Sequence, residues 1–372
     1  MSAAPVAIRE GDFKAFFEAT FACYGADHPY VSPLKGDFRK SVSRQNPLFR
    51  DFARFTLFTA HRGGRTVGRI LAHIHDESNR RHGLERGYFG WFDCIDDLDV
   101  ARKLLDAAGR WVEARGCTEI AGNFNLSITQ VIGVVTEGFD RAAYTYQQAN
   151  PSHIPALLER LGFERFFPMR TFELDVRGLD PGTVLGAKQR ALLGDSRWRF
   201  APILRRGFEQ RLVEACAVLN DGFAENKLFV PLTQEEFLFP CEGMMWIIDQ
   251  TLSWTAYRDD EPVGVVLCIP DLNPFLQATR SRIGLTTPWH LLQLKLHRKR
   301  AAIIFFSIRR AHHNLGANGV LLYKLLGAMK AGGYTHLGVS WISDGNGASL
   351  RQMEKLGATR LHRLHLFRKA LR

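Results

Sequence analysis

The segment from Ile308 to Leu326 combines the residue types that can bind an anionic ligand. Its apolar start is followed by two arginines, and Gly316 and Gly319 precede a stretch of helix-forming residues. A helix that begins after a glycine-containing loop presents free backbone N–H groups and the positive end of its dipole. We therefore expect an anionic cofactor at this loop. The residues expected to hold it are Ile308, Arg309, Arg310, Gly316, Ala317, Asn318, Gly319 and Val320.

Four side chains are candidates for proton transfer. His312 and His313 precede the glycines of this loop, so either imidazole is a candidate base or cofactor contact, with a solvated loop residue as the alternative. Asp344 ends a later strand, where a carboxylate can accept a proton or cap a helix. Tyr146 lies in an inserted loop, residues 126–150, and is a candidate proton donor or a packing residue.

The pair His73 and His75, followed by two acids, places two imidazoles on one face of a strand. That spacing occurs in metal sites, but no further cluster of ligands accompanies it in the sequence. We expect exposed strand histidines and no metal ion.

The elements that must position these residues occur twice. The order helix, Gly-x-Thr, strand, helix, Leu-Gly, strand repeats after about 200 residues, and Leu158–Phe166 and Met353–Leu361 are its clearest matched pair. Two matches in one order indicate a duplication. We expect two domains, residues 1–176 and 177–372, in an α+β chain with two central mixed sheets flanked by helices.

The two copies differ at the helix start that follows their apolar strand. The first copy has Cys94-Ile-Asp-Asp-Leu-Asp99 there, and its three acids cap a helix well but repel a phosphate group. We therefore expect the C-terminal domain to bind the cofactor and the N-terminal domain to lack a good phosphate loop.

The net charge of +11 is concentrated at the C-terminal end. Residues 281–372 contain 16 Lys and Arg against two acids, a balance of +14, so the other residues sum to −3. This asymmetry favours a polyanionic ligand: a nucleotide-like cofactor, an anionic lipid or nucleic acid. A basic nucleic-acid-binding module stays an alternative, but no stacking platform and no recognition-helix motif is present in the sequence, so we expect no nucleic acid.

The 372 residues contain no apolar run of the roughly 18 residues that a membrane span needs. Charged residues interrupt the N-terminal stretch, and the six cysteines form no CxxC pair. We expect a cytoplasmic protein with reduced thiols.

The loop at Gly316-Ala-Asn-Gly319-Val-Leu321 resembles the acyl-CoA pyrophosphate loop of the GNAT acyltransferases, Gln/Arg-x-x-Gly-x-Gly/Ala. Gly319 matches, whereas Gly316 and Leu321 depart from the outer positions. The family's Asn after the next strand is found at Asn346, while its helix-end Tyr is absent from both copies. The resemblance implies a tandem duplicated GNAT fold and acyl-CoA as co-substrate, bound in part by Asn346.

Within that family, Gly68-Arg-Ile70, Asn150-Pro151 and Trp341–Asn346 resemble the tandem members described as bacterial ceramide synthases. This resemblance implies transfer of a long fatty acyl chain from acyl-CoA to the amine of a sphingoid base, without a covalent enzyme intermediate. Acetylation of a small amine or amino acid is the alternative within the same class.

An insert with Trp289, Leu292 and Leu296 at helical spacing ends in the basic run Arg298-Lys-Arg300. Core packing is one interpretation. The other is a basic amphipathic helix on an anionic membrane, which suits a long-chain amine. We include peripheral contact with the inner face of the cytoplasmic membrane among the expectations.

Overall fold

The computed structural model describes residues 4–25, 30–49, 54–241 and 247–371. The first half of the chain contains β1 (Val6–Glu10), α1 (Phe13–Tyr24), α2 (Lys35–Ser41), η1 (Pro47–Phe49), β2 (Phe55–Arg62), β3 (Arg65–Ile74), α3 (Asp76–His82), β4 (Arg86–Cys94), α4 (Leu98–Glu113), β5 (Glu119–Gly122), β6 (Val134–Glu137), α5 (His153–Arg160) and β7 (Glu164–Asp175).

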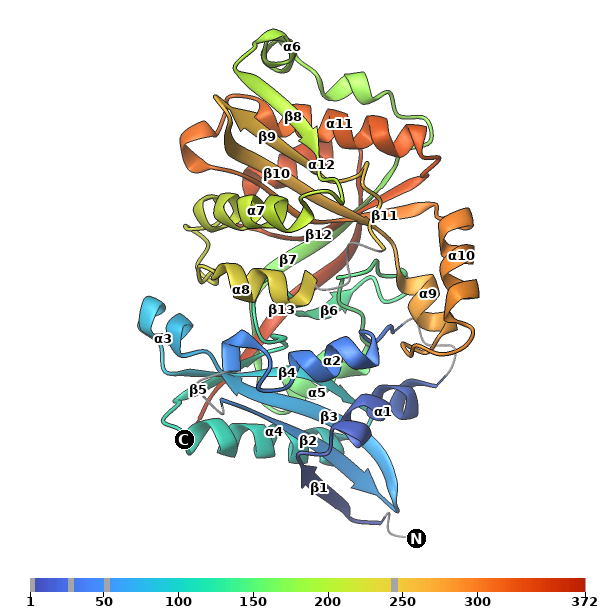
Figure 1. Cartoon of the computed structure of the whole chain (residues 1–372). Coiled ribbons are helices and arrows are strands. Elements are labelled where there is room, and N and C mark those ends of the chain that lie inside the picture. Colours follow the sequence, from blue (N-terminus) through green and yellow to red (C-terminus); the bar gives the residue numbers. More distant parts are fainter. Residues whose placement is uncertain (1–3, 26–29, 50–53, 242–246, 372) are drawn as a thin grey trace.

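The second half contains η2 (Pro181–Val184), α6 (Ala187–Gly194), β8 (Trp198–Pro202), α7 (Phe208–Gly222), α8 (Gln234–Leu238), η3 (Phe239–Cys241), β9 (Trp254–Arg258), β10 (Glu261–Pro270), α9 (Asn273–Ala278), α10 (Thr287–His297), β11 (Arg300–Ile308), η5 (Arg310–His312), α11 (Ala317–Ala331), β12 (His336–Ser343), α12 (Gly347–Lys355) and β13 (Thr359–Ala370). Figure 1 shows the first half below and the second half above.

The described strands form one 13-stranded mixed sheet rather than two. Its order is β1-β2-β3-β4-β5-β13-β7-β12-β11-β10-β9-β8, with β6 beside β13. The expectation of two separate central sheets was wrong, because strands of one half pair with strands of the other. The α+β class and the flanking helices agree with the expectation.

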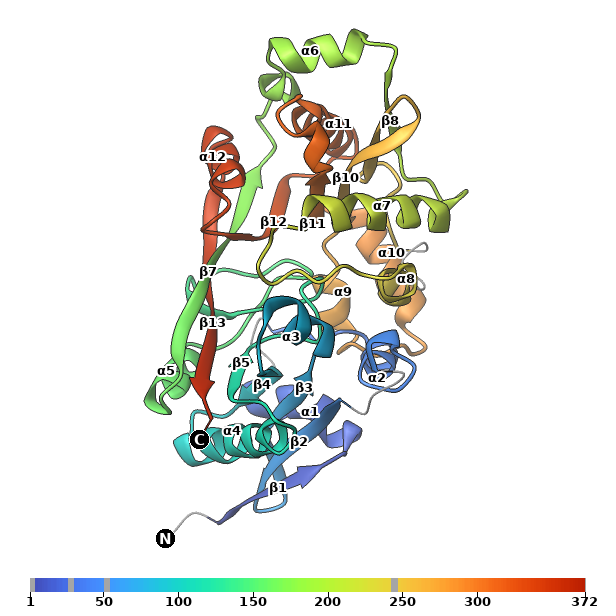
Figure 2. The ribbon, with the colours of Figure 1, turned by 90° about the vertical axis from the view of Figure 1, so that its left-hand side faces the viewer.

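Two long strands join the halves by exchange. β7 pairs with β12, and β13 returns from the end of the chain to pair with β5, β6 and β7. Figures 1 and 2 show β7 and β13 running side by side through the middle of the molecule. The division at residues 176 and 177 stays a prediction, and β13 crosses it.

Each half contains the same unit: an antiparallel hairpin, a helix and a strand parallel to the second hairpin strand. β3–β4–α4–β5 forms the first unit and β10–β11–α11–β12 the second. Both hairpins carry a one-residue β-bulge close to the point where the second hairpin strand leaves its parallel partner, in β4 opposite Ile70 and in β11 at Ile304. The helix–strand–helix–strand order that repeats in the sequence is also present, as α4, β5, α5 and β7 in the first half and as α11, β12, α12 and β13 in the second, with β6 added between β5 and α5.

Local sequence explains how a helix covers each unit. α4 starts where the Asp97 carboxylate accepts hydrogen bonds from the backbone N–H groups of Asp99 and Val100, each at 3.0 Å. Its buried face follows the helical repeat, with Val100, Leu104, Leu105, Ala108 and Val112. Gly87 on β4 lets that face approach, because a Cβ there would lie 2.4 Å from Val112 Cβ. α11 buries its own apolar residues against the second unit in the same way.

Candidate functional site

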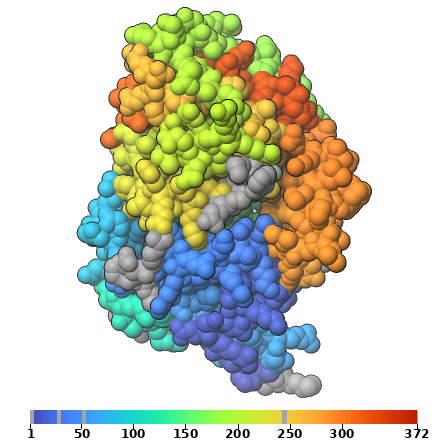
Figure 3. Space-filling view, viewed as in Figure 1, coloured from blue at the N-terminus to red at the C-terminus, as the bar shows by residue number. Residues whose placement is uncertain are grey.

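A cavity of about 1200 Å³ lies between the two halves. Its walls come from both units, from residues 143–149 of the inserted loop, and from α2, α9 and α10. The space-filling view shows its hollow between the blue α2 region and the orange α9–α10 region (Figure 3). The volume exceeds the roughly 300–1,000 Å³ of common small-molecule pockets, so a large ligand fits.

The second unit opens into this cavity through a strand fork formed by β11 and β12. The two strands pair from Arg300 with His336 up to Ile303 with Val339 and then diverge. Beyond that point Ile304–Phe306 and Ser340–Ile342 line the cavity. In the described residues no side chain accepts a hydrogen bond from the backbone of residues 304–307. An extended chain can therefore lie between the strands and meet backbone polar groups, as a substrate does when it adds to a sheet edge.

Gln147 reaches the base of this fork from the inserted loop of the first half. Its Nε2 donates to the carbonyl oxygen of Val339 at 2.9 Å. Tyr144 anchors the same loop, because its ring covers Gly338 and its hydroxyl donates to Glu173. The first half thus closes the inner end of a fork that belongs to the second half.

Gly316 and the start of α11 form the predicted phosphate loop. The backbone N–H groups of residues 314–318 have no hydrogen-bond partner among the described residues, and Gly316 has φ of 107°. Five such donors in succession are typical of an anion site. The close neighbour of the two glycines is Gln189 of α6, whose Cγ would lie 2.8 Å from a Cβ at Gly319. A side chain at Gly319 would therefore clash with α6, which is one reason for a glycine at this position.

The two predicted arginines next to this loop are paired with acids. Arg309 contacts Glu261 at 2.5 Å, and Asp221 accepts from the Arg310 backbone N–H at 2.6 Å. The Arg310 side chain also pairs with Asp221, at 3.4 Å. Both guanidinium groups already have partners, so their positive charge toward a phosphate is partly neutralised.

The two predicted histidines lie outside the cavity. His312 packs edge-on against Trp198, with ring centroids 6.3 Å apart, and burial followed by the nearby Arg258 charge lowers its pKa. His313 is exposed and holds its ring 2.9 Å from the carbonyl oxygen of Ile308. The structure places both beside the phosphate loop and not beside the fork.

Asp344 also lies outside the cavity, held by two arginines. Its carboxylate contacts Arg170 at 3.0 Å and Arg363 at 2.7 Å. Its neighbour Asn346 does line the cavity and caps α12 by accepting from the Ser349 N–H at 3.1 Å. Asn346, and not Asp344, is therefore the residue that caps α12, and the Asp344 carboxylate forms salt bridges with two arginines.

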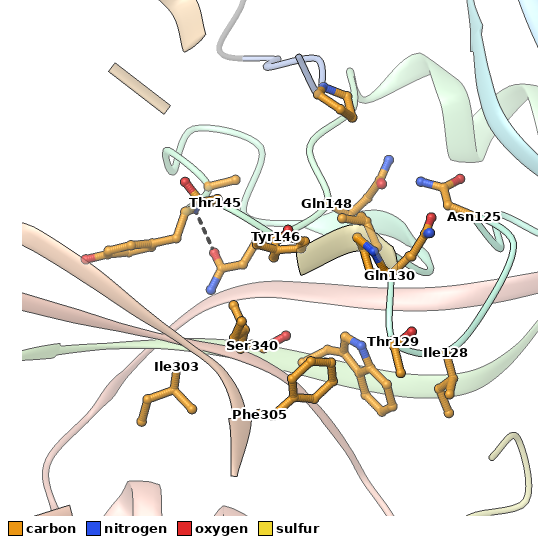
Figure 4. Close-up of a pocket in the computed structure, with 18 of the residues that line it drawn as sticks. Asn125, Ile128, Thr129, Gln130, Thr145, Tyr146, Gln148, Ile303, Phe305 and Ser340 are labelled. Carbon is orange, nitrogen blue, oxygen red and sulfur yellow. Dashed lines mark hydrogen bonds between the residues drawn. The ribbon is translucent and has the colours of Figure 1, made fainter. Parts of the chain in front are cut away.

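Tyr146 is the predicted proton-transfer residue that lines the cavity. Its hydroxyl makes no hydrogen bond within the described part of the chain, and burial raises its pKa. Its φ of 65° is unusual for a tyrosine, and such backbone strain gathers at functional sites. Figure 4 places its side chain in the cavity with Phe305 and Ser340 of the fork.

Three amide side chains that sequence reasoning missed share this part of the cavity. Asn125, Gln130 and Gln148 line it, and Figure 4 shows them with Tyr146. Gln130 has no side-chain hydrogen bond in the residues that the structure describes, and neither has Asn125 Nδ2. Their signal in the sequence was the unusual number of polar amides in a loop next to apolar strands. We refer to these three residues as the amide cluster.

The first unit has an equivalent fork, formed by β4 and β5, but side chains bridge it. Asn125 Oδ1 accepts from the Trp91 N–H at 2.8 Å, and Asn123 Oδ1 accepts from the Phe92 N–H at 3.3 Å. The following helix start is capped by Asp97, whose pKa is lowered chiefly by its hydrogen bond from Arg62. The positions for an extended ligand and for an anion are thus both taken by protein groups.

No group of three or more His, Cys, Asp or Glu residues in the described ranges is placed to hold a metal ion. His73 is fully buried, contrary to the expected exposure, and donates toward the carbonyl oxygen of Phe124 at 2.9 Å. Burial lowers its pKa to about 3. His75 instead caps α3 by accepting from the Ser78 N–H, so the two imidazoles serve separate structural roles.

Comparison with known proteins agrees with this architecture. Residues 222–358 match the Acetyltransferase (GNAT) family. A bacterial ceramide synthase of Caulobacter vibrioides is 27% identical over 97% of this chain and 95% of its own length. Protein YghO of Escherichia coli is 25% identical over 98% of this chain and 94% of its own length.

Among solved structures, a tandem GNAT protein from the clavulanic acid biosynthesis pathway superimposes with a TM-score of 0.60. It is 12% identical and the match covers 98% of both chains. A GCN5-related N-acetyltransferase from Sphaerobacter thermophilus gives 0.53 at 14% identity, covering 99% of this chain and 97% of that one.

Proposed function

This chain is an acyltransferase with a tandem GNAT fold, and from that premise we propose that it transfers a long fatty acyl chain from acyl-CoA to the amine of a sphingoid-type base. The observation that carries the proposal is the open fork of β11 and β12, which continues into a cavity of about 1200 Å³. The similarity to a bacterial ceramide synthase supplies the class of amine.

The donor site is proposed at the second unit. The pantetheine arm of acyl-CoA is extended and carries amides, so it fits between the diverging strands. The pyrophosphate would lie at the row of free N–H groups of residues 314–318, next to Gln189 of α6. Gly345 and Asn346 line the cavity and are exposed, so the donor has access from solvent at this end.

The apolar part of the cavity supports a long acyl chain or alkyl tail. Phe167, Phe237, Phe275 and Phe305 are among the side chains that line it. Each buried CH₂ contributes about 0.8 kcal/mol, which is about a fourfold gain in affinity. The size of the cavity lets this gain accumulate over many methylenes.

The amide cluster is proposed to hold the polar head of the acceptor. Asn125, Gln130 and Gln148 offer donors and acceptors without a net charge. Neutral amides hydrogen-bond hydroxyl groups and, unlike a carboxylate, form no ion pair that would hold the amine in its protonated form. An amino-alcohol suits this lining.

The chemical step then needs no covalent enzyme intermediate. The amine loses a proton to cavity water, and its lone pair attacks the thioester carbonyl, whose oxygen is polarised by backbone N–H groups of the bulged β11. The C–S bond breaks, and Tyr146 donates its hydroxyl proton to the leaving thiolate. The tyrosinate regains a proton, through cavity water, from the attacking nitrogen, which thereby becomes the neutral amide. Asp344, His312 and His313 are not assigned the base role, because none of them lines the cavity.

Peripheral contact with an anionic membrane is part of the proposal, since a long-chain amine resides in a bilayer. The test of the function is a chain-length series of acyl-CoA donors with a sphingoid base and with small amines, read by mass spectrometry of the N-acyl product. Palmitoyl-CoA with the long-chain base should exceed acetyl-CoA by at least 100-fold in kcat/KM. A preference for acetyl-CoA with a soluble amine would replace this proposal by small-amine acetylation.

A further inference from the structure

The surface of α10 and of the loop before it is unusually apolar. Eight large apolar side chains of the described residues are exposed, and five of them lie between residues 283 and 296. Their exposed fractions are 77% for Ile283, 103% for Leu285, 59% for Trp289, 46% for Leu292 and 66% for Leu296. Such a concentration marks an interaction surface rather than scattered exposure. We call these five residues the α10 surface.

Positive charge accompanies this surface. Residues 272–300 contain no Asp or Glu. Lys295 and Lys299 are exposed, and neither has an ion pair in the part of the chain that the structure describes. By contrast, Arg298 pairs with the buried Asp249 at 3.0 Å and Arg300 with the buried Asp271 at 3.1 Å. The two lysines, and not the two arginines, are thus available to an anionic partner.

The α10 surface is continuous with the mouth of the cavity. Ile283 belongs to both, and Thr287 and Leu291, on α10, line the cavity wall. On the other side of the mouth lie Leu34 and residues of α2 that include Lys40. The hollow between α2 and α10 in Figure 3 is this mouth. A ligand that leaves the α10 surface can therefore enter the cavity directly.

The two sides of the mouth are fixed to each other at one end. Ser281 Oγ donates to the carbonyl oxygen of Ser32 at 2.6 Å, and Arg282 contacts Glu18 at 2.6 Å. These contacts join the two sides of the mouth across a large separation in the chain, which is 249 residues for the contact between Ser281 and Ser32.

We infer that the α10 surface docks on an anionic phospholipid bilayer and that the mouth between α2 and α10 takes the long-chain amine directly from it. The inference rests on the proposed function for the identity of that amine. α10 has 11 residues, and no helix in the described ranges is long and apolar enough to cross a membrane. The apolar side chains enter the interface and the two lysines meet the anionic headgroups, as in other interfacial helices.

The experiment compares four forms of the full chain: wild type, Leu285→Ser/Trp289→Ser, Lys295→Gln/Lys299→Gln, and Leu193→Ser. Leu193 on α6 is 41% exposed and far from α10, so it is the matched control for loss of an exposed leucine. Binding is measured by co-sedimentation with vesicles of phosphatidylcholine and 30% phosphatidylglycerol, and with pure phosphatidylcholine. Turnover is measured with the amine in vesicles and in detergent micelles.

Wild type and Leu193→Ser should bind the anionic vesicles, at least tenfold more tightly than the neutral ones. Both double variants should lose binding at least tenfold and turnover on vesicle-borne amine by a similar factor, while turnover on micellar amine stays within twofold. Equal binding of wild type and double variants, or no vesicle binding by wild type, would overturn the inference. Variant-sensitive vesicle binding without any N-acylation in micelles would keep the docking surface and reject the proposed function.

Discussion

The two strand forks differ in whether side chains bridge them, although the units around them are duplicates and each has a β-bulge. In the fork of β4 and β5, Asn123 and Asn125 bridge the diverging strands and Asp97 caps the helix that follows. In the fork of β11 and β12, no side chain of the described residues bridges the corresponding strand positions, and the helix start has free N–H groups. We infer that a few side chains decide which copy can hold a ligand.

The first copy, whose fork is bridged, still contributes residues to the cavity. Asn125 belongs to the amide cluster, and Trp91 and Asp93 form part of the cavity wall. Asp93 is held by the fully buried Arg69 at 2.7 Å, and this pair ties β3 to β4 behind that wall. We therefore propose that the acyl donor binds at the second copy and the polar head of the acceptor at the first.

The largest effect should come from bridging the open fork. Ser340 corresponds to Asn123 by its place one residue beyond the last strand pair, so Ser340→Asn offers Phe306 the bridge that Asn123 gives Phe92. We expect kcat/KM to fall at least 100-fold and CoA binding to be lost, as read by calorimetric titration.

The reverse change, Asn123→Ser, is the control. It removes a buried hydrogen bond and should lower the free energy of unfolding by about 1–3 kcal/mol while CoA affinity stays within twofold. Loss of CoA affinity in Asn123→Ser and its retention in Ser340→Asn would reverse the assignment of the two forks.

Tyr146→Phe should have the next largest effect. It keeps the ring but removes the proton donor, so kcat should fall about 100-fold with little change in the KM for acyl-CoA. Tyr144→Phe is the matched control, because the Tyr144 hydroxyl bonds Glu173 and anchors the loop. If both variants lose kcat equally, loop position rather than proton donation explains the loss.

A charge exchange at the two helix starts should have a smaller effect. Asn318 and Asp99 are each the second residue of their helix, α11 and α4. Asn318→Asp places a carboxylate beside the proposed pyrophosphate and should weaken CoA binding about tenfold. Asp99→Asn should leave it unchanged. Equal CoA affinities of wild type and Asn318→Asp would show that the pyrophosphate does not bind at the start of α11.

The smallest effect on turnover is expected from a substitution of His73. This residue affects the stability of the first half and its dependence on pH. Its pKa is about 3 in the folded chain, so below its ordinary pKa of 6.5 the unfolded chain binds a proton that the folded chain does not. This contribution to stability is complete above pH 6.5 and declines toward pH 3, by about 2 kcal/mol at pH 5.

Melting temperatures at pH 7.5 and pH 5 check this dependence. His73→Gln keeps a donor for the Phe124 carbonyl and cannot titrate in this range, so its melting temperature should fall less between the two values. An identical fall in both proteins would show that other groups cause the acid sensitivity.

Local sequence was sufficient for the elements and for their duplication. The strands and helices around Leu158–Phe166 and Met353–Leu361 follow from periodicity and from glycines at helix ends, which are local features. The exchange of β7 and β13 was missed because strand pairing depends on partners about 200 residues apart, Phe367 and Arg165 for example.

The site was harder to predict for the same reason. Tyr146 lines the cavity, and its proton-donor role stays a prediction. The partners of Asp344 are Arg170 and Arg363, and neither is adjacent in the sequence. The amide cluster joins residues 125, 130 and 148 through loop conformation, which no periodicity encodes.

The most direct measurement is the stoichiometry of CoA binding in solution, by equilibrium titration of wild type, Ser340→Asn and Asn123→Ser. We expect one CoA per chain in wild type, none in Ser340→Asn and one in Asn123→Ser. Two CoA molecules per wild-type chain, or one that persists in Ser340→Asn and disappears in Asn123→Ser, would contradict this expectation.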